Sequence, residues 1–231
     1  VVNGNFQIDV EADNNVYKGQ LNFDNAGFKI NRLNAAFSLK DETLNIDDEG
    51  IKLNNFRIKD EGDNTLSISG EITTDNFVNP GFDLSFKAKD FKILEASDDD
   101  NSSFYGKAVV DVDGTIKGDL QIPDVDASLK INSETDFVYV LPASTASVEK
   151  REGVVRFVNR EDPDQILTRS DTKSGAITGF DINSFIKVDD AAKFSIILDK
   201  NTGDNFKVQG KGDLNFQMFP NGRINLSGFY E

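Results

Sequence analysis

The chain has 231 residues and a formal net charge of −15, and it contains no Cys and no His. This acidity argues against a nucleic-acid partner and against static binding to an anionic membrane surface, since both need clustered Lys and Arg. Without His or Cys, the chain lacks the commonest general base, the commonest metal ligand and any disulfide. This composition removes most hydrolase triads and most zinc or copper sites, and we expect no cofactor and no metal site.

Apolar and polar residues alternate along most of the chain, which predicts strands with one apolar and one polar face. In chain order the alternating runs before the C-terminal part are Phe6–Val10, Leu21–Phe23, Phe28–Ile30, Phe37–Leu39, Leu44–Ile46, Ile51–Leu53, Phe56–Ile58, Leu66–Ile72, Phe82–Phe86, Val110–Ile116, Leu120–Ile122 and Leu129–Ile131. Runs that recur about every 10 to 14 residues indicate an all-β fold, a long meander of antiparallel hairpins.

The alternation is clearest in the C-terminal stretch KFSIILDKNTGDNFKVQGKGDLNFQMFPNGRINLSGFYE. Hairpin turns are expected there at Asn201–Gly203 and at Pro220–Gly222. Gly210 and Gly212 interrupt the pattern, which predicts a bend or a bulge in the strand. The preceding NSFIKVDDAAKF is either a short helix or a strand followed by a turn.

The chain is expected to form a single elongated domain over residues 1–231. Polar residues predict flexible segments at 96–103 and at about 142–176. No apolar run has the length of a membrane-spanning helix, and no signal peptide is present. Because the chain begins at Val1 rather than Met, we expect a piece of a longer protein, with any anchor outside it.

Something must cover the apolar face of such a sheet, because each large apolar side chain left in water costs about 1.5 to 3 kcal/mol. Two architectures do this. A second sheet can close over the first as a β-sandwich or a closed barrel. Alternatively, the sheet curls into an open groove whose contents are apolar. Alternation alone does not separate these architectures.

The stretch GDLNFQMFPNGRINLSGFYE, together with IILDKNTGDNFKVQGKG, resembles the C-terminal domain of the TamB family of the translocation and assembly module. VYVLPASTASVEKREGVVRFVNREDPDQ is similar to the Bacteroidota-type version of that domain. The resemblance is specific from about residue 137 to 231 and general before that. It implies an AsmA-like open U-shaped groove, or β-taco, with an apolar interior.

By this resemblance, the function is that of a non-enzymatic periplasmic conduit that carries phospholipid acyl chains between the inner and outer membranes. The full-length protein would be anchored in the inner membrane, outside this chain. Its C-terminal end would dock on an outer-membrane Omp85-type barrel, TamA- or BamA-like. The expected lipid-groove lining is Phe82, Leu84, Phe86, Val110, Val112, Leu129, Ile131, Phe194, Ile196, Leu198, Phe206, Val208, Leu214, Phe216, Met218, Ile224 and Leu226.

Other functions remain open at this point. One alternative is an assembly or translocation factor for outer-membrane proteins that acts with the barrel. A second is an extracellular binding or adhesive β domain with a closed core. A glycoside hydrolase is the weakest, because nothing in the sequence positions two carboxylates across a cleft.

Two acidic runs, DVDGTIKGD and DKNTGD, superficially suggest calcium loops. Neither has the central Gly and the distant Glu of an EF-hand, so ordinary hairpin turns are favoured over an adventitious cation. The residues concerned are Asp111, Asp113, Asp119, Asp199, Asn201 and Asp204.

Overall fold

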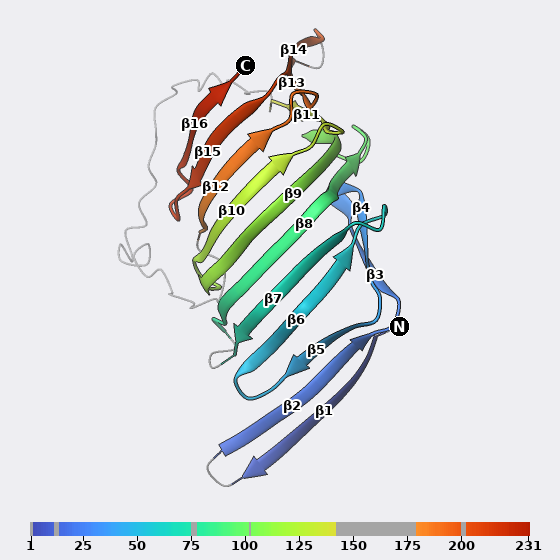
Figure 1. Ribbon diagram of the computed structural model, residues 1–231, viewed down its shortest axis with the longest axis vertical. Helices are drawn as coiled ribbons and strands as arrows, with labels where there is room; N and C mark the ends of the chain where they lie inside the picture. The colour runs from blue at the N-terminus through green and yellow to red at the C-terminus, as the bar shows by residue number, and fades with distance from the viewer. Residues whose placement is uncertain (1, 12–13, 75–77, 102, 142–178, 200–201) are drawn as a thin grey trace, which may run out of the picture.

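A single twisted β-sheet dominates the structure (Figure 1). The computed structural model describes all residues except 1, 12–13, 75–77, 102, 142–178 and 200–201. The described residues form a sheet of 16 strands, with one short 3-10 helix. None of their helical segments is long and apolar enough to cross a membrane.

The elements follow the predicted alternation closely. They are β1 (Val2–Glu11), β2 (Asn14–Phe23), β3 (Ala26–Ile30), η1 (Asn31–Leu33), β4 (Ala35–Leu39), β5 (Glu42–Ile46), β6 (Gly50–Lys59), β7 (Thr65–Thr73), β8 (Gly81–Ala96), β9 (Phe104–Asp119), β10 (Pro123–Ile131), β11 (Asp136–Val140), β12 (Asp181–Val188), β13 (Lys193–Asp199), β14 (Asp204–Gln209), β15 (Gly212–Met218) and β16 (Ile224–Tyr230).

The sheet is open. Its main path runs β1-β2-β5-β6-β7-β8-β9-β10-β12-β15-β16, with β1 and β16 as the two edges. Among the described residues the edges do not pair with each other and no second sheet packs on the first. The all-β open-groove prediction is confirmed, and the sandwich or closed barrel is not formed.

Two strand pairs differ from the expected hairpin meander. β10 pairs with β12 in parallel, and β11 pairs with β13 in parallel. A parallel pair needs a connection of a dozen or more residues, and residues 142–178 between β11 and β12 supply that length. The alternation within each strand carries no information about direction, so it did not predict these pairs.

The sequence interpretation is also settled at three local positions. NSFIKVDDAAKF is a strand followed by a turn, with the Ala192 N–H donating to the Asp189 carbonyl at 3.1 Å. Leu120–Ile122, expected as a strand, is the turn between β9 and β10, where the Asp119 carboxylate accepts from the N–H groups of Gln121 and Ile122. Pro220–Gly222 is the expected turn, with the Gly222 N–H donating to the Phe219 carbonyl at 2.8 Å. The segment predicted to be flexible at about 142–176 lies outside the described residues.

Several strands are interrupted where the sheet bends. β10 and β11 lie along one neighbour, β9, with the break at Asn132–Thr135. The same kind of break separates β12 from β13 at Asp189–Ala192 and β14 from β15 at Gly210–Lys211. The predicted bend at Gly210 is thus confirmed. These breaks divide the sheet into a main arm, which is the path given above, and a side arm of β3, β4, β11, β13, β14 and the adjoining ends of β8 and β9.

In the N-terminal half, Asn and Asp residues make the corresponding bends. Asn25, Asp41, Asn55 and Asp90 lie at strand breaks or bulges and have φ values of 57, 56, 53 and 52°. Among non-glycine residues, Asn and Asp enter this left-handed region most readily. The residue type therefore explains where the strands turn from one arm to the other.

Two clusters of buried apolar residues lie near these bends. One contains Ala35, Phe37, Ala88 and Phe91. The other contains Leu39, Leu53 and Phe56, and partly buried residues from β2 to β8 pack against it. Both clusters lie between β2 and β9, so the C-terminal half of the apolar face has no comparable described cluster covering it.

Candidate apolar groove

Cross-strand register aligns apolar side chains in rows that run across the main arm. Directly paired residues of neighbouring strands lie on the same face of a sheet. One row is Ile58, Leu66, Ala88, Val112, Leu129, Ile186, Leu214 and Gly228. The next is Phe56, Ile68, Phe86, Gly114, Ala127, Ser184, Phe216 and Leu226.

Further rows lie on either side of these two. Toward the hairpin turns, one row is Leu53, Gly70, Leu84, Ile116, Val125, Ile182, Met218 and Ile224, followed by Ile51, Ile72, Phe82, Gly118 and Pro123. Toward the bend, the row is Phe91, Val110, Ile131, Val188, Gly212 and Tyr230.

The rows above carry no charged side chain from β6 to β16, and their only polar side chains are Ser184 and Tyr230. Lys and Asp residues occupy the alternate positions of the same strands, for example Lys87 paired with Asp113, whose side chains form an ion pair of 3.0 Å. The main arm therefore offers a continuous apolar surface along the direction perpendicular to its strands.

Exposure of this surface is lowest beside β4 and near the bend, where Val110 and Val188 are 5% and 3% exposed, and highest at the C-terminal edge strand. Leu53 and Phe56 are 7% exposed and Phe91 is 3% exposed, because β4 and its neighbours pack over them. At the edge strand β16, Ile224 and Leu226 are 57% and 59% exposed. The apolar face is closed near β4 and open near β16.

The structure assigns the predicted lining residues to both arms. Those in the rows of the main arm are Phe82, Leu84, Phe86, Val110, Val112, Leu129, Ile131, Leu214, Phe216, Met218, Ile224 and Leu226. In the side arm, Phe194 pairs with Val208, and Ile196 pairs with Phe206. Leu198 lies at a register shift between β13 and β14 and is 51% exposed.

The predicted set omitted residues that occupy the same rows. Ile182 and Ile186 of β12 were missed because a helix was also possible there, although their period-two spacing was the available signal. Ile116 and Val125 lie opposite each other between β9 and β10. Phe137 of β11 pairs with both Gly106 and Phe194 in the side arm.

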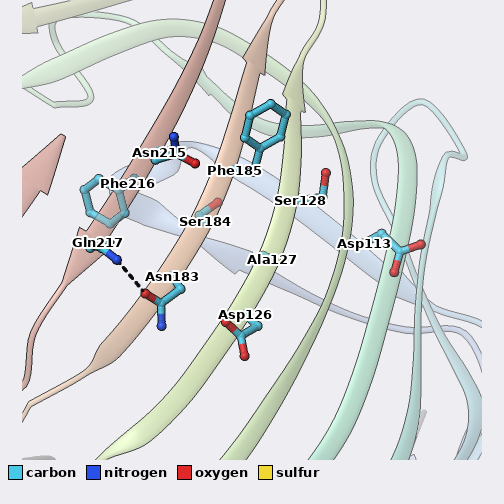
Figure 2. A pocket seen from close by; sticks show the side chains of 10 residues that line it. All are labelled: Asp113, Asp126, Ala127, Ser128, Asn183, Ser184, Phe185, Asn215, Phe216 and Gln217. Atoms are coloured by element: carbon cyan, nitrogen blue, oxygen red, sulfur yellow. Dashed lines mark hydrogen bonds between the residues drawn. The ribbon is translucent and has the colours of Figure 1, made fainter. Parts of the chain in front are cut away.

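A shallow hollow of about 410 Å³ lies on the opposite, polar face (Figure 2). Its lining includes Asp126, Asn183, Phe185 and Gln217, which alternate with the apolar rows along β10, β12 and β15. The Gln217 amide donates to Asn183 Oδ1 at 3.3 Å, as one rung of a cross-strand ladder. Phe216 of the predicted lining also borders the hollow, together with Ala127 and Ser184 of its row, but most of the hollow's other residues belong to the polar face.

The described parts of the two acidic runs lie in strands and turns. Asp111 and Asp113 lie within β9 rather than in a hairpin turn, so the turn expected for DVDGTIKGD is wrong except at Asp119. In DKNTGD, Thr202 Oγ1 donates to the Asp204 carboxylate at 2.8 Å, as in an ordinary polar turn, while Asn201 lies outside the described residues. The described residues include no group of three or more acidic side chains placed to hold a metal ion.

A buried amide joins two carboxylates at the bend. Asn132 is 5% exposed, and its Nδ2 donates to Asp90 Oδ1 and to Asp111 Oδ1, both at 2.8 Å. Burial alone would raise the pKa of Asp111, but the Asp90 N–H and the Asn132 amide, with two nearby lysines, hold that pKa below its ordinary value. This network fixes the bend and leaves Asp111 ionised.

An open sheet with a continuous, uncharged apolar face defines the class of β-groove proteins. Residues 54–231 match the family described as the TamB C-terminal domain, and the chain belongs to the TamB family. The match begins well before residue 137, where the specific resemblance in the sequence started. No curated protein and no solved structure matches the chain.

Family membership places the chain in the cell envelope of Gram-negative bacteria. TamB proteins are generally non-enzymatic components of translocation and assembly, and they work with a TamA-type partner.

Proposed function

We propose that the chain is part of a periplasmic conduit that carries phospholipid acyl chains between the inner and outer membranes along its apolar face. The observation that carries this proposal is the uncharged set of rows from β6 to β16, which is most exposed at β16. A soluble protein rarely leaves such a surface uncovered without a ligand or a partner.

An apolar groove avoids the free-energy cost of exposing acyl chains to water. Each methylene removed from water contributes about 0.8 kcal/mol, so a two-chain lipid with about thirty methylenes faces a barrier of tens of kcal/mol to crossing water alone. Along the rows, the chains stay in contact with side chains such as Leu214 and Phe216, while the headgroup remains in water. Movement is sliding, with no covalent step and no catalytic residue.

The test is mass spectrometry of lipids extracted from the chain purified from bacteria without detergent. Leu214→Asp puts a charge on the apolar face, whereas Asn215→Asp puts the same charge on the polar face of the same strand. Copurified phospholipid lost only in Leu214→Asp supports the conduit. Lipid-free wild-type protein, or equal lipid in both variants, contradicts it.

A second function, assembly of outer-membrane proteins, is favoured by the edge position of β16 in the described sheet. Among the described residues β16 pairs with β15 alone, so its outer side is where a strand from an Omp85-type barrel, TamA- or BamA-like, or from a nascent protein would add. A photo-crosslinker at Phe229, which is 63% exposed on this strand, tests the contact in cells. Crosslinks to a barrel from Phe229 but not from Asn215 support docking through β16.

The two functions are separable by their variants. A conduit requires the apolar rows, so Leu214→Asp lowers phospholipid delivery to the outer membrane while the crosslink at Phe229 persists. An assembly factor that uses only the edge loses outer-membrane proteins when β16 is blocked and tolerates Leu214→Asp. An adhesive β domain gains no support, since its closed core is not formed.

The stretch at residues 138–165 further supports a Bacteroidota-type version of the domain. Comparison of this stretch across sequenced TamB proteins tests the assignment, which fails if the same pattern is as frequent outside that group.

A further inference from the structure

The hairpin of β3, η1 and β4 leaves the main path of the sheet, and residues 26–39 are called the flap here. The strand ladder joins the flap to β6 only through the pair Ser38 and Lys59, and in the described part of the chain it does not join β4 to β8. At both ends the flap connects to the main arm next to left-handed residues, Asn25 and Asp41. The backbone thus attaches the flap to the main arm along one side only, through the bends at Asn25 and Asp41 and the Ser38–Lys59 pair.

Side chains hold the flap over the apolar face of β8. The Phe37 ring stacks on the Phe91 ring with centroids 5.6 Å apart and planes 13° apart. Ala35, 2% exposed, joins them in one cluster with Ala88. Phe91 and Ala88 both belong to the apolar rows, so the flap lies across the surface that acyl chains would follow.

Polar side chains fasten the tip of the flap. Asn34 Nδ2 donates to the Glu95 carbonyl at 2.9 Å and to Asp100 Oδ2 at 3.1 Å. The Asn101 amide donates to the Arg32 carbonyl at 3.1 Å. These side-chain bonds join the flap to the end of β8 and to the turn before β9, in place of a backbone strand ladder.

We propose that the flap is a gate across the groove, swinging about the bends at Asn25 and Asp41. The proposal rests on the conduit function, because a gate matters only if acyl chains pass. With the flap closed, Phe37 and Phe91 fill the apolar face between β4 and β8, and passage along the rows stops there. With the flap open, the rows are continuous from β6 to β16.

Hydrogen exchange measures the opening directly on the chain. Amides at the Ser38–Lys59 pair are expected to exchange at least about tenfold faster than those of the β3–β4 and β8–β9 ladders, because flap opening breaks this pair and keeps both ladders. Phe37→Leu, which keeps an apolar side chain but loses the ring stack, should widen that difference. Equal exchange of the pair and the ladders in both proteins overturns the gate.

Crosslinking tests whether opening is needed for passage. The chain has no native cysteine, so Asn34→Cys with Asp100→Cys, joined by a short bis-methanethiosulfonate crosslinker, locks the flap. Ser97→Cys with Asp100→Cys is the matched control, since both residues lie in the turn after β8 and their side chains already touch at 2.8 Å. Delivery of pulse-labelled phospholipid to the outer membrane is then followed in cells whose full-length protein carries each pair.

Crosslinking is expected to lower the rate of phospholipid delivery at least about tenfold with the flap pair and to leave the rate unchanged with the control pair. Normal delivery in the crosslinked flap pair, in cells where Leu214→Asp still stops delivery, overturns the gate and leaves the conduit standing. Normal delivery in both the flap pair and Leu214→Asp removes the conduit, and the gate with it.

Discussion

Replacing Leu226 on the edge strand distinguishes an open groove from a closed core. In the open sheet Leu226 is 59% exposed, so roughly two fifths of the side chain is out of water. Full burial of a leucine contributes about 1.5 to 3 kcal/mol, and scaling it to the buried part gives a loss of about 0.6 to 1.2 kcal/mol for Leu226→Asn. A core leucine truncated to Ala loses about 2 to 5 kcal/mol.

Urea denaturation and lipid analysis are measured on the same preparations. Leu226→Asn is expected to shift the unfolding free energy by no more than about 1.2 kcal/mol, yet to lower copurified phospholipid at least twofold, since Leu226 ends a row that also contains Phe216. Ser227→Asn, on the polar face of β16, is the control and should change neither quantity. Phe91→Ala, at 3% exposure, should lose about 3 to 5 kcal/mol.

Two outcomes refute this reasoning. A loss above about 3 kcal/mol for Leu226→Asn means that β16 is covered in solution and that its side chains are core. An unchanged lipid content in a folded Leu226→Asn protein means that the rows near the edge do not contact the cargo.

The remaining predictions concern the bend and the packing of the main arm. Tyr230→Phe should raise the unfolding free energy by about 1 kcal/mol, because the buried Tyr230 hydroxyl has no hydrogen-bond partner among the described residues. Burial also raises the pKa of Tyr230, so the wild type should lose stability as the pH rises above about 10. Tyr230→Phe should lose less stability over the same range, and thermal melts at pH 8 to 11 measure the difference. Asn132→Ala should lower the unfolding free energy by about 3 kcal/mol at pH 7, since two hydrogen bonds to carboxylates are lost. The loss should be smaller below pH 4, because the pKa of Asp111 is lowered in the folded protein and the stability it contributes fades as acid protonates it. Urea titrations at both pH values check this. Gly114→Ala should cost about 1 to 3 kcal/mol in urea melts, because its Cβ would lie 2.7 Å from Phe86 Cζ and 2.6 Å from a backbone carbonyl oxygen.

The strands and the apolar face were predictable because period-two alternation is a local property. Leu214, Phe216 and Met218 share one parity in the sequence and one face of β15 in the structure. The same parity predicted strands but not their partners, so the parallel β10–β12 pair was not foreseen. Which strands pair depends on residues distant in the chain, and the alternation within one strand carries no information about them.

The bends were predictable only in part. Gly210 interrupts the apolar–polar alternation and predicts the strand break between β14 and β15. Asp90 instead follows an unbroken run in β8, and its left-handed φ of 52° depends on the Asp111 carboxylate that accepts from its N–H at 2.8 Å. Such a contact joins two strands and becomes visible only when both are placed. The flap was missed for this reason, since its bends at Asn25 and Asp41 look like ordinary polar turns in the sequence.

Closing the flap still leaves a usable length of groove. Beyond β8 the rows cross β9, β10, β12, β15 and β16, and strands about 4.8 Å apart make this stretch on the order of 20 Å long. One leaflet of a bilayer's hydrocarbon core is about 15 Å thick, so a phospholipid's acyl chains fit along the stretch with the flap shut. Locking the flap with the Asn34→Cys and Asp100→Cys crosslink should therefore stop passage without emptying the protein. Equal copurified lipid in the locked and unlocked chains is the expected result, and loss of that lipid on locking would show that cargo occupies the flap region itself.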